Sequence, residues 1–251
     1  MSPRADDVDE SAIAIRVADV RARIADAAAT SGRAAHDVRL IAVTKTHPAA
    51  VVRAGVSAGL RDFGENRVQE LVDKRRIAPE ASWHFIGRLQ RNKVRFVADG
   101  KTLIHSVDRT ALVDAIEARA ARAGVVQPVL VQVNVGDDPA KGGCEVERLR
   151  ELVAYAHEQS NIRVRGLMTV PPLPPSSRRA SDDVRGHFAT LRGLRDDIVG
   201  TYPTVRELSM GMTADFEVAI EEGATMVRLG TALFGTRESA RAKVISTEDP
   251  R

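Results

Sequence analysis

Residues 40–48 read LIAVTKTHP, and this stretch decides the fold class. Four consecutive apolar residues, Leu40 to Val43, lack the alternation of a strand with one wet face, and such runs are typical of strands buried on both faces of a parallel sheet. The run ends at Lys45, and Pro48 follows where a helix can begin. Two interpretations of the lysine are open at this point: an amine that reaches solvent at a strand end, or an amine held inside a site.

The same order of strand and helix recurs along the chain. An amphipathic helix is predicted first, from Val8 to Thr30, and helical patterns such as 110–124 separate the later strands. The predicted strands are 38–45, 61–65, 82–87, 103–107, 128–134, 164–170, 207–211 and 225–230. Eight strands that alternate with helices predict the α/β class and a parallel (β/α)8 TIM barrel with an extra N-terminal helix. A doubly wound open sheet is the alternative, which is disfavoured because no G-x-G-x-x-G follows the first strand.

Length and composition fit a single domain. The 251 residues are 43% hydrophobic, so residues 1–251 are predicted to form one domain, with flexible tails at 1–7 and 245–251 and a long loop at 171–183. The net charge is only +3 and aromatic residues make up 4%, which argues against nucleic-acid binding. The acidic N-terminus, the single cysteine (Cys144) and the absence of a long apolar run predict a cytoplasmic protein that does not contact a membrane.

Polar residues and glycines gather where the predicted strands end. Active sites of TIM barrels lie at the carboxyl ends of the strands. Such ends are occupied by Lys45, Asn66, Ser209, Gly230 and Thr231. A lysine that faces this mouth would be surrounded by protein, and desolvation would lower its pKa toward the range where the free amine is populated. An amine of this kind condenses with aldehydes and ketones.

Two stretches near the C-terminus are suited to a phosphate group. Residues 208–220, LSMGMTADFEVAI, and residues 227–235, VRLGTALFG, each combine a strand end, glycine and hydroxyl groups with a helix start. Backbone N–H groups in such turns bind phosphates, and the loops after strands 7 and 8 are the usual phosphate site of TIM barrels. Arg228 alternates onto the same inward face as Gly230, and a buried arginine requires a partner or a ligand. Together with Lys45, these features predict a site for a phosphorylated carbonyl compound.

Several motifs match a known family. They are AVTKTHP (42–48), FGENRVQE (63–70), WHFIGRLQRNK (83–93), HSVDR (105–109), VNVGDDPAKGG (133–143), RGLMTVPP (165–172), LSMGMTADFEVAI (208–220) and VRLGTALFGTR (227–237). In these motifs the chain resembles the pyridoxal 5′-phosphate (PLP) homeostasis protein family, whose fold is similar to the barrel domain of alanine racemases. The resemblance implies that Lys45 holds PLP as an internal aldimine and that Arg228 faces the pyridine nitrogen.

The resemblance also assigns the rest of the ligand. It implies that Ser209, Gly230 and Thr231 bind the phosphate and that Asn66 lies beside the ring. No catalytic residue and no metal ligand is predicted.

The sequence departs from the family pattern at a few positions. The family tends to carry glutamate and serine where this chain has Asp138 and Ala140, whereas Lys141 and Gly143 keep their spacing. The loop is therefore predicted to be retained, while any role that needs the longer carboxylate is in doubt. In the motif after the seventh strand, Thr213 replaces the usual serine and keeps a hydroxyl.

The predicted site favours a carrier over an enzyme. Arg228 against the pyridine nitrogen would disfavour ring protonation and weaken the ring as an electron sink. In the racemases a tyrosine from a second domain supplies the second acid or base, whereas this sequence ends soon after the barrel motifs. Its tyrosines, Tyr155 and Tyr202, stand at no predicted carboxyl end of a strand. His84 and His47 are the remaining candidates, although a lone strand histidine is more often a hydrogen-bonded structural residue.

The sequence thus predicts a monomeric PLP-binding protein of PLP homeostasis that holds PLP on Lys45 and delivers it to PLP-dependent apoenzymes. One alternative is a low-activity amino-acid racemase or another PLP-dependent enzyme. Another is an aldolase that uses Lys45 on a phosphorylated sugar without a cofactor. The basic segment Arg88 to Lys93 has two interpretations, a solvated surface or a second anion or client site.

Overall fold

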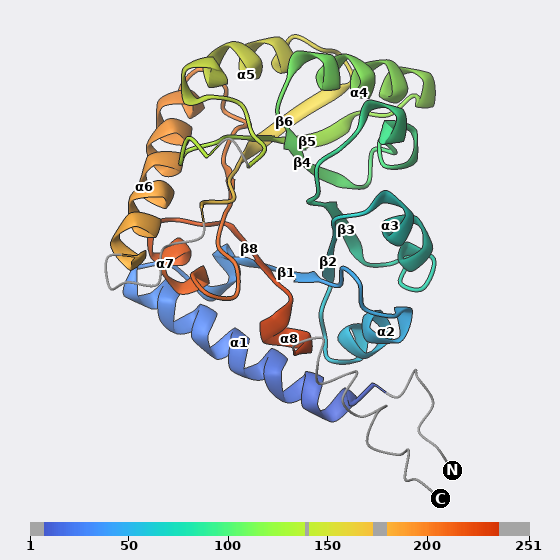
Figure 1. The fold of residues 1–251 in the computed structure, drawn as a ribbon, viewed down its shortest axis with the longest axis vertical. Coiled ribbons are helices and arrows are strands. Elements are labelled where there is room, and N and C mark those ends of the chain that lie inside the picture. Colours follow the sequence, from blue (N-terminus) through green and yellow to red (C-terminus); the bar gives the residue numbers. More distant parts are fainter. Residues whose placement is uncertain (1–7, 139–140, 173–179, 236–251) are drawn as a thin grey trace, which may run out of the picture.

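The computed structural model describes residues 8–138, 141–172 and 180–235, and within them parallel strands close a barrel in chain order (Figure 1). The strands are β1 (Arg39–Val43), β2 (Asp62–Glu65), β3 (Ser82–Phe85), β4 (Leu103–Val107), β5 (Gln127–Gln132), β6 (Ile162–Met168), β7 (Glu207–Ser209) and β8 (Met226–Leu229). The α-helices are α1 (Glu10–Thr30), α2 (Ala49–Ser57), α3 (Val68–Arg75), α4 (Thr110–Ala123), α5 (Leu149–His157), α6 (Ala180–Val199), α7 (Phe216–Glu221) and α8 (Thr231–Phe234). Pairing of β1 with β8 closes the ring, which confirms the predicted (β/α)8 fold.

Short 3-10 helices complete the connections. They are η1 (Ala35–Asp37), η2 (Arg91–Phe96) and η3 (Val146–Arg148). The third strand is therefore followed by a 3-10 helix, and the helix predicted at 110–124 is present as α4 with Gly124 as its left-handed cap at φ 66°.

Several strands end earlier than the sequence predicts. β1 stops at Val43 instead of residue 45, and β7 stops at Ser209 instead of Gly211. Backbone bonds to the neighbouring strands continue for a short distance past these ends, from the Thr44 N–H to the Gly64 carbonyl and from the Met210 N–H to the Met226 carbonyl, before the chain turns over the barrel mouth. The predicted loop 171–183 is also too long, because α6 already begins at Ala180. The rest of that loop at 173–179 and the predicted tails at 1–7 and 245–251 lie outside the described residues.

The extra N-terminal helix covers one side of the barrel. Its apolar stripe, which consists of Ile13, Val17, Val20 and Ile24, is buried as predicted. The side chain of Asp9 caps the helix by accepting a hydrogen bond from the Ala12 N–H at 2.9 Å. Figure 1 shows α1 running along the outside of the ring, past α7, α8 and α2. None of the described helices combines the length and the apolar character that crossing a membrane requires.

The protein has two hydrophobic cores, one outside the ring of strands and one inside it. The larger core fills the space between strands and helices and includes Phe63 and Trp83, whose rings lie 5.5 Å apart. A second, smaller cluster comes from strands alone and lies within the ring; its buried members are Ile41, Leu103, Leu130, Met168 and Met226. Because neighbouring residues of a strand face opposite sides, the position after Trp83 faces the interior of the barrel.

Candidate functional site at the barrel mouth

The residues predicted to form the site lie at one end of the barrel. Lys45 lies in the turn after β1, Asn66 directly follows β2, and Ser209 is the last residue of β7. Gly230 directly follows β8 as the N-cap of α8, and Thr231 is the first residue of that helix. Since β1 pairs with both β2 and β8, the turns after these three strands are neighbours at the mouth.

The turn that carries Lys45 has an unusual backbone. Thr46, the next residue, has a left-handed conformation with φ 64°, which is rare for a β-branched side chain and requires support from its surroundings. Lys45 itself is exposed, so the expectation of a lysine surrounded by protein is wrong. The short β1 explains this result, because the chain has already left the sheet when it reaches the lysine.

A group of buried and half-buried polar side chains supports this turn from the helix side. We call it the lysine cluster, and it consists of Thr44, Glu65, Glu70 and Lys74. The ammonium group of Lys74 donates to the backbone carbonyl of Thr44 at 2.7 Å. The carboxylate of Glu70 accepts the backbone N–H of Thr46 at 2.7 Å. The residues on both sides of Lys45 are therefore held by one pair of side chains from α3.

The lysine cluster carries one cation between two carboxylates. Lys74 Nζ lies 2.7 Å from Glu65 and 2.9 Å from Glu70. Burial raises the pKa of Glu65, although hydrogen bonds from Lys74 and the Thr44 hydroxyl oppose the shift. Burial would also raise the pKa of Glu70, but hydrogen bonds from Lys74 and from the Thr46 N–H lower it overall. The second oxygen of Glu65, Oε2, is buried without a hydrogen-bond partner among the described residues, so this carboxylate depends on Lys74.

Arg228 lies inside the barrel wall below the mouth. Its side chain is buried, and it has partners as a buried arginine must: Nη1 donates to Ser209 Oγ at 2.7 Å and Nη2 donates to the Thr169 carbonyl at 2.8 Å. Burial lowers the pKa of Arg228 to about 10, and the charge of Asp215 opposes this shift. The guanidinium has five N–H groups, of which these two bonds use two.

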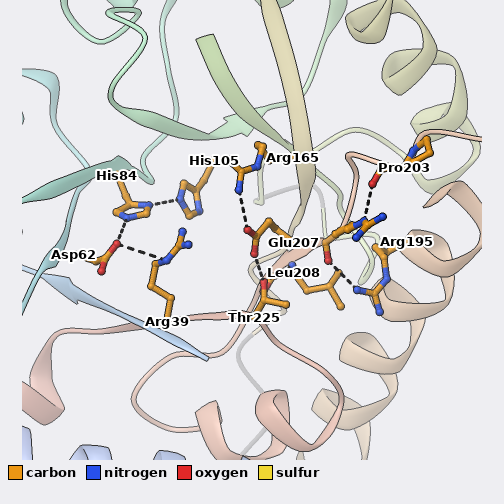
Figure 2. A network of polar contacts seen from close by, with 11 residues as sticks. Arg39, Asp62, His84, His105, Arg165, Arg195, Pro203, Glu207, Leu208 and Thr225 are labelled. Atoms are coloured by element: carbon orange, nitrogen blue, oxygen red, sulfur yellow. Dashed lines mark hydrogen bonds and ion pairs between the residues drawn. The ribbon is translucent and has the colours of Figure 1, made fainter. Parts of the chain in front are cut away.

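A line of hydrogen bonds continues from Arg228 through the barrel. We call it the histidine chain, and it consists of Asp62, His84, His105 and Ser209. Ser209 Oγ lies 2.9 Å from His105 Nδ1, and His105 Nε2 lies 3.0 Å from His84 Nδ1. His84 Nε2 lies 3.0 Å from Asp62 Oδ1. Figure 2 shows the two imidazole rings pointing toward each other, with Asp62 and Arg39 next to His84.

Both histidines are buried, and their environment disfavours a positive charge. Burial lowers the pKa of His84, although the hydrogen bond and the charge of Asp62 oppose this shift. Burial lowers the pKa of His105 further, and the charges of His84, Arg228 and Arg39 act in the same direction. His84, considered above as a possible acid or base, is thus a neutral, hydrogen-bonded residue of the interior and does not lie alone.

The two predicted phosphate turns lie against each other. A Cβ atom at Gly230 would lie 3.1 Å from the carbonyl oxygen of Val43, so a side chain there would crowd the β1 turn. The Thr213 hydroxyl accepts from the Ala232 N–H at 3.4 Å, which links the turn after β7 to the start of α8. Thr231 is exposed at this junction.

Ser209 and Asn66, the other two predicted ligand residues, differ in their surroundings. The Ser209 hydroxyl is fully buried and contacts Arg228 and His105, as described above. Asn66 is exposed, and its carbonyl oxygen passes so close to Gly87 that a Cβ atom at Gly87 would lie 2.1 Å away. Gly87 therefore allows the chain after β2 to reach the mouth.

The loop after β5 turns back sharply at Gly143. This glycine has φ 127°, and a Cβ atom there would lie 2.6 Å from the backbone nitrogen of Asn134. The backbone of Cys144, the next residue, forms an isolated parallel β-bridge with Val133. Burial raises the pKa of the Cys144 thiol to about 12, which fits a structural cysteine and not a reactive one. Asp138 closes the turn by donating its N–H to the Asn134 side chain at 3.3 Å, whereas Ala140 lies outside the described residues.

Other candidates lie away from the centre of the mouth or on the surface. The Tyr155 hydroxyl donates to Asp114 at 2.5 Å on the outer helices, and the Tyr202 ring packs on His157. The His47 ring lies 5.6 Å from the ring of Phe234, beside the Lys45 turn. In the basic segment, the side chains that carry charge are exposed; they are Arg88, Arg91 and Lys93.

Sequence reasoning missed the residues that support Lys45 and Arg228. Glu70 and Lys74 are spaced four residues apart, and on a helix such as α3 that spacing is a signal of an ion pair. His105 alternates inward within β4, and Asp62 begins β2, but nothing local to either residue indicates its partner. Their contacts follow from the register of the closed barrel.

Comparisons with known proteins agree with this fold and show the family. Residues 15–238 match the family described as alanine racemase, N-terminal domain. The chain is 46% identical over 226 residues to the pyridoxal phosphate homeostasis protein of Aquifex aeolicus, covering 89% of this chain and 97% of that protein. It is 44% identical over 230 residues to the protein of the same name from Pseudomonas aeruginosa, covering 91% and 97%. The solved structure of PipY from Synechococcus elongatus PCC7942 with PLP bound superposes with a TM-score of 0.77 at 35% identity, covering 89% of this chain and all of that one.

Proposed function

The chain belongs to the pyridoxal phosphate homeostasis protein family, and from this premise we propose that it binds PLP at the barrel mouth through a Schiff base on Lys45. PLP brings an aldehyde that condenses with an amine, together with an aromatic ring and a phosphate. The observation that carries the proposal is the Lys45 turn, which α3 holds from both sides and which lies beside the turns after β2 and β8.

The residues around this turn fit the parts of PLP. Lys45 is exposed, so an aldehyde from solvent can reach its amine. In the proposal the backbone at Gly230 and Thr231 binds the phosphate, and Arg228 donates to the pyridine nitrogen from the barrel wall. Asn66 lies beside the ring. Ser209 is proposed to contribute to the phosphate site, and because its hydroxyl contacts Arg228 and His105, it also supports the ring site through Arg228.

The proposed role is homeostasis of a reactive aldehyde. Reversible condensation with Lys45 lowers the concentration of free PLP and keeps it available for PLP-dependent apoenzymes. An arginine at the pyridine nitrogen disfavours the protonated ring, which limits the use of PLP as an electron sink. We also propose that the protein works as a monomer in the cytoplasm.

The decisive experiment is an absorption spectrum of the purified protein with added PLP, followed by borohydride reduction and peptide mass mapping. We expect a yellow species that reduction fixes on Lys45 and that is absent from Lys45→Ala. Lys101→Ala, which removes another exposed lysine, serves as the matched control and should behave like the wild type. A protein that takes up no PLP, or a label on a different lysine, would refute the proposal.

Transfer is tested separately from binding. The loaded protein should reconstitute the activity of a PLP-dependent apoenzyme, and Lys45→Ala mixed with the same amount of PLP and then desalted should not. Racemisation of alanine or serine at a rate that depends on Lys45 would instead support the racemase alternative. Sedimentation of the loaded protein at the mass of one chain would support the monomer.

A further inference from the structure

The histidine chain spans the barrel from its amino end toward its mouth. Asp62 is the first residue of β2, whereas Ser209 is the last residue of β7. Between them the two imidazole rings contact each other directly, and beyond Ser209 the line ends on Arg228. The apolar cluster of Ile41 and its neighbours also lies in the barrel interior and offers these polar groups no hydrogen bonds, so they depend on one another.

With both rings neutral, as their burial favours, the two ends of this line set the direction of every hydrogen bond in it. Asp62 offers carboxylate oxygens that accept, so His84 Nε2 carries the proton and donates. A neutral His84 then has Nδ1 free to accept, and His105 Nε2 donates to it. The same reasoning makes His105 Nδ1 an acceptor for the Ser209 hydroxyl. The Ser209 oxygen in turn accepts from Arg228, which can only donate.

Burial favours this neutral arrangement, whereas the charges around the rings act in both directions. The groups that act on the two histidines are Asp62, Arg39, Glu207 and Arg228. Arg39 lies 3.7 Å from Asp62, so the carboxylate at the end of the chain is itself paired. Glu207 is bonded to Arg165 and to the Thr225 hydroxyl (Figure 2), which leaves the histidine chain as a separate line. A proton added at His105 Nδ1 would remove the acceptor of the Ser209 hydroxyl.

We infer that Asp62, His84 and His105 are positioning residues that, through Ser209, fix the direction in which the Arg228 guanidinium faces the ring of a bound ligand. This inference rests on the proposed function, because it takes Arg228 to donate to the pyridine nitrogen. An arginine side chain has several rotatable bonds, and its two anchored N–H groups remove that freedom. The histidine chain thereby connects ring recognition at the mouth to residues at the amino end of the barrel.

The first test uses the protein without ligand. Nitrogen NMR of the imidazole rings at pH 7 distinguishes a neutral ring protonated on Nε2 from one protonated on Nδ1 and from the charged ring. We expect His84 and His105 both to be neutral and protonated on Nε2. A proton on Nδ1 of either ring, or a positive charge on either, would overturn the directional chain.

The second test compares two ligands that differ only at the ring nitrogen: PLP and deazapyridoxal phosphate, in which carbon replaces this nitrogen. We expect His105→Leu to lower the affinity for PLP by about 10-fold, the effect of one hydrogen bond to a charged group, and to leave the affinity for the deaza compound unchanged. An equal loss for both compounds would indicate a general structural role and would overturn the inference, as would no loss for either.

The matched controls separate this result from misfolding and from failure of the proposed function. His36→Leu makes the same change at an exposed histidine and should alter neither affinity. If His105→Leu does not fold, Asp62→Ala should produce the same selective loss of affinity for PLP. Asp62→Asn should keep the affinity, because the amide carbonyl oxygen can accept the hydrogen bond from His84. Equal affinities of Asp62→Ala and Asp62→Asn for PLP would overturn the inference. A wild-type protein that binds neither compound would refute the proposed function. The NMR experiment would then still test the hydrogen-bond directions of the histidine chain.

Discussion

The lysine cluster and the histidine chain support the same mouth in different ways. The lysine cluster lies outside the barrel, between β2 and α3, and holds one cation between two carboxylates. The histidine chain lies inside the barrel and consists largely of neutral groups with one direction of donation. A neutral chain avoids most of the desolvation cost of burying charge, whereas a charged cluster depends on keeping every partner. We therefore expect the two regions to respond differently to substitution and to pH.

The largest effect should come from removing the cation of the lysine cluster. Lys74→Met leaves Glu65 fully buried with one oxygen already unpartnered, and breaking a buried ion pair in this way costs about 3–5 kcal/mol. Urea unfolding at pH 7 measures this loss of unfolding free energy. Lys101→Met, at an exposed lysine, is the control.

A second substitution shows whether the loss comes from the stranded carboxylate. Adding Glu65→Leu to Lys74→Met removes the unpaired charge and should recover most of the lost stability. A Lys74→Met protein within about 1 kcal/mol of the wild type would contradict the view that the cluster is a tightly coupled unit.

A smaller effect is expected from pH, and the two regions should contribute with opposite sign. His105 has a folded-state pKa below the unfolded value of 6.5, so the unfolded chain takes up its proton first and stability falls as the pH drops below 6.5. Each such histidine contributes at most about 1.4 kcal/mol per pH unit. Glu65 has a raised folded-state pKa, so the folded protein takes up its proton first and gains stability as the pH falls.

Urea unfolding at pH 7.5, 6.0 and 5.0 separates these contributions. Relative to the wild type, His105→Gln should lose less stability on acidification, and Glu65→Gln should lose more. Glu70, whose pKa is lowered from 4.5, should not contribute within this range. Identical pH profiles for the three proteins would show that neither group titrates differently on folding.

The smallest effect should come from the edge of the lysine cluster. Glu70→Ala removes the acceptor of the Thr46 N–H but leaves Lys74 paired with Glu65, so we expect a loss of about 1 kcal/mol. Hydrogen exchange at the Thr46 amide should accelerate, while exchange at Ala42 within β1 should not change. Unaltered protection of Thr46 would mean that the left-handed turn at Lys45 does not depend on Glu70.

Much of the barrel could be predicted because its signals are local. Apolar runs of strand length such as Leu40 to Val43, and helix signals such as the Gly124 cap, each lie within a few neighbouring residues. The predicted ends of β1 and β7 were wrong by two residues, because the point where a strand leaves the sheet depends on what its backbone bonds to across the mouth. Nothing within residues 40–48 indicates that the ammonium group of Lys74 donates a hydrogen bond to the Thr44 carbonyl.

The sequence by itself determined the (β/α)8 order, the strand-end positions of Lys45 and Gly230, and the family to which the chain belongs. Only the tertiary structure decided that Lys45 is exposed, that α3 holds its turn, and that Arg228 is anchored through Ser209 to a pair of histidines. The physical reason is that periodicity and turn chemistry act between near neighbours, whereas these contacts join strands and helices far apart in sequence. Their geometry exists only after the barrel has closed in register.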